Sequence, residues 1–146
     1  MIIQNIYLPK YKWHIKVYYA VDTYYTEDIL KECIAYNPTI KEYSKIKEFL
    51  EDYEYNSGFT LTDYINNKSL IIIGLTTSPA EFQNTLDHEK GHLATHIARE
   101  CDINPYSEEY QYLVGKIGEK MFPVAKKFLC EHCKKELTLD VFHKEI

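Results

Sequence analysis

The sequence predicts a single α+β domain over residues 1–146, with a mostly antiparallel sheet packed on helices. Of the 146 residues, 45% are hydrophobic, which is enough for one core and leaves little room for a second. Strand-like and helix-like segments follow one another as β-β-α-α-β-β-α-α, without the alternating βαβ units of a parallel sheet. Five Gly, five Pro and no internal repeat exclude a repetitive or disordered chain.

The first half of the chain is expected to hold a hairpin and two short helices. Residues 2–8 and 14–21 are typical of strands, since apolar and polar side chains alternate in the second segment. Thr26 is expected to cap the first helix. Thr39, with Glu42 three residues later, forms a capping box for the second helix.

The second half is expected to hold two more strands and two longer helices. Residues 59–65 and 69–75 are rich in β-forming residues, and the unbroken Leu-Ile-Ile-Ile run in the second segment predicts an interior strand. Ser78, followed by a proline at the first helical position, opens a helix over about 79–100. Ser107 is expected to cap the last helix.

Charge and composition exclude several classes of function. The net charge is −5, and Arg99 is the only arginine, so nucleic acid is not an expected partner. No run of about 18 apolar residues predicts a membrane span, and the first residues lack the pattern of a secretory signal. We therefore expect no membrane partner and a cytoplasmic location.

The most informative motif is His88-Glu89-Lys90-Gly91-His92, an H-E-x-x-H pattern inside the expected long helix. Side chains four residues apart share one helix face, so both imidazoles can bind a single Zn²⁺. Glu89 then lies beside the metal, where it can take a proton from bound water. The alternative is a pair of surface histidines on an amphipathic helix. Gly91 costs about 1 kcal/mol in a helix interior, which suggests that a backbone or a substrate approaches there.

A catalytic zinc site needs a third protein ligand, and four candidates follow the motif. Glu108 is favoured because it shares a helix side with Gly115, and the nearby Gly118 also permits close approach to the motif helix. The remaining candidates are Glu109, Glu119 and His96.

Together, the motif and the acid at the start of the next helix resemble the gluzincin zinc metallopeptidases. The chain more closely resembles small H-E-x-x-H proteins of phages and prophages, and His96 is similar to a position in the ImmA/IrrE peptidases. The resemblance implies a zincin-like fold with a central motif helix and a strand edge that binds an extended peptide. It makes His88 and His92 zinc ligands, Glu89 the general base and Glu108 the third ligand.

The function expected from this resemblance is zinc-dependent hydrolysis of peptide bonds, with water activated by Zn and Glu89. The substrate would be a peptide or protein in the cytoplasm, that of the host for a phage protein, with a protein partner as one source of specificity. The alternative is a non-catalytic zincin-like binding or structural protein, such as a phage accessory component. The residue that would stabilise the oxyanion stays open among His96, Tyr110 and Tyr112.

The four cysteines are expected to be thiols or metal ligands rather than disulfides. Cys130 and Cys133 form a C-x-x-C pair that, with His132 and His143, could hold a second zinc. Two plain thiols, or a redox pair, are the alternatives. Cys33 lies on an apolar helix stripe and is expected in the core.

Overall fold

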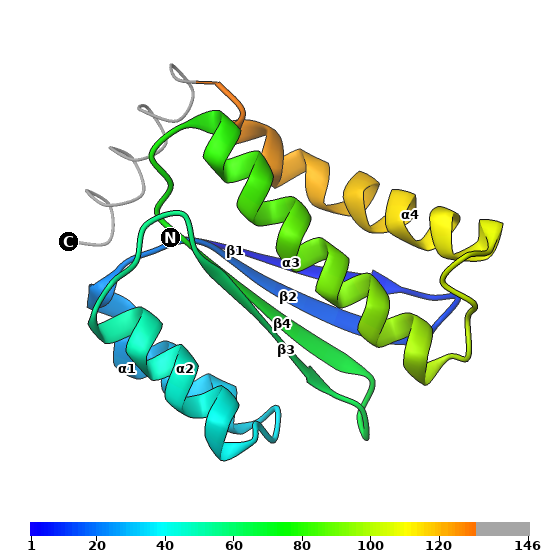
Figure 1. The fold of residues 1–146 in the computed structure, drawn as a ribbon, viewed down its shortest axis with the longest axis horizontal. Helices are drawn as coiled ribbons and strands as arrows, with labels where there is room; N and C mark the ends of the chain where they lie inside the picture. Colours follow the sequence, from blue (N-terminus) through cyan, green and yellow to red (C-terminus); the bar gives the residue numbers. More distant parts are fainter. Residues whose placement is uncertain (131–146) are drawn as a thin grey trace.

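The computed structural model describes residues 1–130 and contains a four-stranded sheet with helices on both faces (Figure 1). One face is covered by α3 and α4, the other by α1 and α2. This arrangement confirms the α+β class. The elements are, in chain order, β1 (Ile2–Leu8), β2 (Trp13–Val21), the single turn η1 (Thr23–Tyr25), α1 (Thr26–Ile34), α2 (Ile40–Glu51), β3 (Gly58–Asp63), β4 (Lys68–Gly74), α3 (Pro79–Glu100), α4 (Glu108–Ala125) and the single turn η2 (Lys126–Phe128).

The sheet is mixed, with the strand order β1-β2-β4-β3. The β1–β2 and β3–β4 pairs are antiparallel, as the sequence predicts, whereas β2 and β4 are parallel. The parallel pair arises because α1, α2 and β3 separate β2 from β4 in sequence, and β3 takes the outer edge. The interior position predicted for residues 69–75 is confirmed, since β4 is buried on both faces.

Side chains that alternate along the strands are buried in two separate cores, one on each face of the sheet. Val17 and Ile71 face α3 and α4, whereas Tyr18 and Ile72 face α1 and α2. The predicted apolar stripe of α3 is buried in the first core and consists of Phe82, Leu86, Leu93 and Ile97. This stripe fixes which side of α3 meets the sheet.

Three of the predicted helix starts, at Thr39, Ser78 and Ser107, are confirmed in atomic detail. The Ser78 hydroxyl accepts a hydrogen bond from the Glu81 amide at 3.1 Å, and α3 spans the predicted residues. Thr39 and Glu42 form both hydrogen bonds of the capping box, each 3.0 Å long.

The prediction that Thr26 caps α1 is wrong. A single 3-10 turn, η1, runs directly into α1 and places Thr26 inside the helical path. The Thr26 hydroxyl therefore donates to the Thr23 carbonyl at 2.8 Å, and Asp22 caps the turn instead. Within residues 1–130, no helix is long and apolar enough to cross a membrane.

Candidate metal and acid-base site

Helix α3 carries His88 and His92 on one exposed side, one turn apart. Their Nε2 atoms lie 3.1 Å apart. Two nitrogens that each lie about 2.0–2.1 Å from a tetrahedral zinc are roughly 3.3 Å apart. The pair therefore fits two neighbouring ligand positions of such a metal with little rearrangement.

Glu89 lies between this pair and the edge strand β3 and is only 4% exposed. The Thr60 hydroxyl of β3 lies 2.8 Å from the Glu89 Oε1 atom, to which it donates, and 3.2 Å from the Glu89 carbonyl oxygen. Gly58 leaves room for this side chain, because a Cβ there would lie 2.9 Å from Glu89 Cγ. Within residues 1–130, the Thr60 hydrogen bond is made to Oε1, and Glu89 Oε2 has no hydrogen-bond partner.

The electrostatic surroundings favour a carboxyl group that accepts protons readily. Burial raises the pKa of Glu89 above its ordinary value. The Thr60 hydrogen bond and the charges of His88 and His92 oppose this rise without cancelling it. A carboxyl group with a raised pKa suits proton transfer near neutral pH.

A cavity of about 330 Å³ opens beside these residues. Elements α2, β3 and α3 line it with the residues Glu42, Gly58, Phe59, Thr60, His88, Glu89, His92 and His96. Sequence reasoning assigned Glu42 to helix capping alone, and its Oε1 atom does accept from the Thr39 amide. The same side chain also reaches the cavity, which no local pattern indicates.

The structure does not bring the predicted third ligand to the histidine pair. Glu108 is exposed in the first turn of α4 and does not line the cavity. A Cβ at Gly118, not at Gly115, would meet the motif helix, 3.5 Å from Lys90 Nζ. Glu108 lies ten residues before Gly118, about 15 Å along the helix. Within residues 1–130, no three His, Cys, Asp or Glu side chains are arranged to hold a metal.

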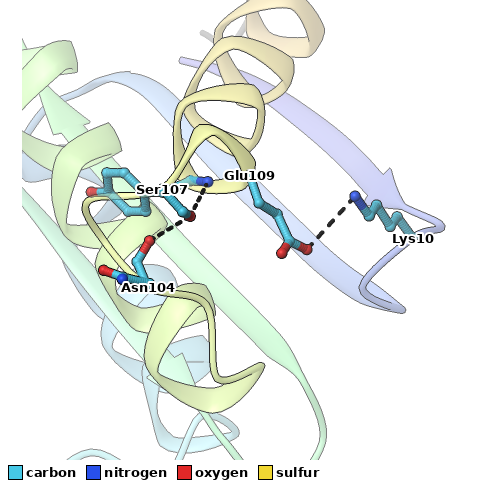
Figure 2. Close-up of polar contacts among 5 residues, drawn as sticks. Lys10, Asn104, Ser107 and Glu109 are labelled. Atoms are coloured by element: carbon cyan, nitrogen blue, oxygen red, sulfur yellow. Dashed lines mark hydrogen bonds and ion pairs between the residues drawn. The ribbon is translucent and has the colours of Figure 1, made fainter.

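The other acidic candidates on α4 have partners elsewhere. Figure 2 shows Glu109 pointing toward Lys10 of the β1–β2 turn, and the two charged groups lie 3.7 Å apart. Ser107 fixes the start of α4 beside it by accepting from the Tyr110 amide at 3.2 Å (Figure 2). Glu119 pairs with Lys116 on the same helix at 3.0 Å.

His96 lies one further turn along α3 and lines the same cavity. Its Nδ1 atom is 2.8 Å from the Thr62 hydroxyl. Burial lowers the pKa of His96, and the charges of Arg99 and His92 lower it further, against the opposing effect of Glu42. Of the three candidate oxyanion partners, His96 alone lines this cavity, since Tyr110 and Tyr112 belong to α4.

The cysteines add little to this site. Cys33 is buried in the core between α1, α2 and the sheet, as predicted, and burial raises the pKa of its thiol to about 12. Of the residues considered for a second zinc, His132, Cys133 and His143 lie outside the described residues, so the choice between a zinc site, a redox pair and two plain thiols stays a prediction.

Comparisons of this chain with protein-family models, curated proteins and solved structures gave no match. The chemistry of the site therefore rests on its own geometry.

Proposed function

We propose that this protein is a zinc-dependent metallopeptidase in which His88 and His92 bind the metal and Glu89 is the general base. The proposal rests on one observation: a buried carboxylate lies beside two imidazoles spaced for one metal, at an open cavity. In metal-assisted hydrolysis, imidazoles hold the metal ion and a nearby carboxylate accepts a proton from the attacking water.

When bound, zinc supplies positive charge that polarises a peptide carbonyl and lowers the pKa of water. His88 and His92 would provide two of its ligands. Glu108 is the third ligand that the family resemblance implies. Glu42 is the carboxylate that the cavity itself offers, and its Oε2 atom has no hydrogen-bond partner within residues 1–130. The identity of the third ligand is therefore decided by experiment, as described in the Discussion.

Glu89 performs the proton transfers in this proposal. Thr60 holds Oε1 of the carboxylate by a 2.8 Å hydrogen bond, so Oε2 is oriented and available. This oxygen takes a proton from the attacking water and later delivers it to the leaving amine. The hydrogen bond fixes the carboxylate before substrate arrives, so no reorganisation is needed at the moment of reaction.

The substrate of this proposal is an extended peptide. Strand β3 lies at the edge of the four-stranded sheet and pairs only with β4 within residues 1–130. Its outer edge offers main-chain groups to a peptide strand, which would pass the cavity lined by Gly58 and Thr60. An antiparallel edge strand beside the motif helix is also the arrangement expected of a zincin-like fold.

The alternative is a non-catalytic zincin-like binding or structural protein, such as a phage accessory component. The position of Glu108 favours this alternative, because Glu108 is exposed in the first turn of α4 and does not line the cavity with His88 and His92. Such a protein would bind a partner or a weakly held metal without cleaving peptides.

The experiment that separates the two compares wild type, Glu89→Gln and His92→Ala. Metal analysis after mild dialysis should find zinc in wild type and in Glu89→Gln, and little in His92→Ala. A diverse peptide library, with products identified by mass spectrometry, measures cleavage with and without a chelator. We expect Glu89→Gln to lower turnover about 10²- to 10⁴-fold, because it cannot accept a proton.

Three results would contradict the proposal. Wild-type protein without zinc would remove the metal site altogether. Zinc-loaded protein that cleaves no peptide would favour the non-catalytic alternative, and equal cleavage by wild type and Glu89→Gln would reveal a contaminating protease.

A further inference from the structure

A row of polar side chains crosses the sheet and ends at His96. Trp13 Nε1 lies 3.0 Å from Ser69 Oγ, which lies 2.7 Å from Thr62 Oγ1, which in turn lies 2.8 Å from His96 Nδ1. The four residues belong to β2, β4, β3 and α3, and the three strands are neighbours in the sheet (Figure 1). Trp13 and Ser69 are 0% exposed, so solvent does not supply alternative partners at that end.

The direction of the hydrogen bonds in this row is set by its first member. An indole N–H can only donate, so Ser69 Oγ accepts from Trp13. The Ser69 hydroxyl then has one hydrogen to place, and its other neighbour within residues 1–130 is Thr62. Because buried hydroxyl groups are almost always paired, Ser69 donates to Thr62. The Thr62 hydroxyl accepts that hydrogen bond and donates its own to His96 Nδ1.

This direction selects one form of the His96 ring. An Nδ1 atom that accepts a hydrogen bond carries no proton, so the neutral ring carries its proton on Nε2. Nε2 lies across the ring from Thr62 and has no hydrogen-bond partner within residues 1–130. The ring lines the cavity shared with His88 and His92. The cavity therefore contains an oriented N–H donor that has no protein acceptor.

We propose that His96 is a substrate-binding residue whose Nε2–H donates to a main-chain carbonyl oxygen of a bound peptide. Thr62 and Ser69 are positioning residues that hold His96 in this tautomer. The choice of a peptide as ligand rests on the proposed function, whereas the tautomer does not.

The same reasoning removes His96 from the set of metal ligands. A histidine binds a metal through a nitrogen lone pair, and Nε2 has none when it carries the proton. His96 could bind metal in the cavity only if Thr62 turned its hydroxyl away from Nδ1. With Ser69 already donating to Thr62, the Thr62 hydroxyl hydrogen would then have no acceptor in the row.

Nitrogen NMR of the imidazole rings in the intact protein, at a pH where the rings are neutral, measures the tautomer directly. We expect the proton of His96 to be on Nε2 in wild type. In Thr62→Val, which keeps the side-chain size, no hydroxyl group donates to Nδ1. The Nδ1–H form should then gain about 5- to 10-fold in relative population. Thr62→Ser, which keeps the hydroxyl, should retain the wild-type tautomer.

Thr95→Ala is the matched control, because Thr95 lies on the same helix and donates its hydroxyl to the Gly91 carbonyl outside the row. It should leave the His96 tautomer unchanged. Wild-type protein with the proton on Nδ1 would overturn the proposal, and this measurement requires no variant to fold.

Two titrations of wild type test the consequences. Added Zn²⁺ should move the ring signals of His88 and His92 and leave the Nε2 proton of His96 in place; loss of that proton to the metal would overturn the proposal. N-acetyl-trialanine-N-methylamide, which offers only main-chain amides, should shift the His96 Nε2–H signal at millimolar concentration. The binding role of His96 would be overturned if the peptide shifted other signals to saturation but left the His96 signal unchanged. It would also be overturned if the peptide shifted no signal, even if peptides are cleaved.

Discussion

Replacing Gly58 by Ala tests how closely β3 lies against α3. Gly58 begins β3, and an added Cβ would lie 2.8 Å from the Ile72 carbonyl oxygen and 2.9 Å from Glu89 Cγ. Neither atom can withdraw easily. Ile72 belongs to the interior strand β4, and the Thr60 hydrogen bond holds the Glu89 side chain. We therefore expect Gly58→Ala to force a local displacement of β3 or Glu89.

Two opposing effects set the size of the change. Adding a methyl group to a filled site costs about 1–3 kcal/mol. Replacing Gly by Ala also restricts the unfolded chain, which returns about 0.4–1 kcal/mol, and this gain applies because Gly58 does not have a positive φ. The net loss in the free energy of unfolding should be roughly 1–2 kcal/mol. For a chain of this length, that loss lowers Tm by roughly 3–8 °C.

Urea unfolding, followed by the fluorescence of the single tryptophan Trp13, measures this loss. Gly115→Ala is the matched control, since a Cβ at this helical position would meet no atom within 4 Å. It should raise stability by up to about 1 kcal/mol. If Gly58→Ala were as stable as Gly115→Ala, the close approach of β3 to Glu89 would be refuted.

Three further predictions concern the site and its supporting turn. If the cavity supplies the third zinc ligand, Glu42→Gln should weaken zinc binding at least 10- to 100-fold, and more than Glu108→Gln does. Competition with a chromogenic chelator measures both affinities. A larger loss in Glu108→Gln would support Glu108 as the ligand. Thr60→Val preserves side-chain size but removes the hydrogen bond to the general base, so it should lower kcat for peptide cleavage about 10-fold while zinc content stays unchanged. Asp63 accepts three hydrogen bonds from the β3–β4 turn, which lower its pKa, so the stability it contributes is complete above about pH 4 and is lost as the pH falls through the lowered value. Asp63→Asn should therefore lower the free energy of unfolding by about 1 kcal/mol at pH 7. The difference in this free energy between variant and wild type should become smaller in acid, as measured by urea unfolding at several pH values.

Elements whose signals are local were predicted well from sequence. Ser78 and the proline after it fix the start of α3, because cap and first-turn preferences act within a few residues. The unbroken apolar run of β4 indicates burial on both faces wherever the strand lies in the sheet. The Thr26 prediction was wrong because the 3-10 turn before it already has helical geometry, so the cap lies earlier in the chain, at Asp22.

The parts of the site that depend on distant residues could not be predicted in this way. The choice of Glu108 assumed an offset between two helices, and helix sequences alone do not fix that offset. Glu42 enters the cavity because α2 reaches the edge of the sheet, which its capping pattern does not reveal. The alternation of Thr60 and Thr62 with Phe59 and Leu61 was a usable signal for a polar strand face. It did not say which helix that face would meet.

The position of that polar face also explains how an edge strand keeps its register. Glu89 and His96 lie seven residues apart, about two turns, so they share a side of α3 and meet Thr60 and Thr62 on alternate residues of β3. A slip of β3 by one residue would turn these hydroxyls away and present Phe59 and Leu61 instead. Glu89 would then be a buried carboxylate without a donor, which costs more than the hydrogen bond itself contributes. The contacts that orient the site therefore also disfavour the wrong pairing of the strand beside it.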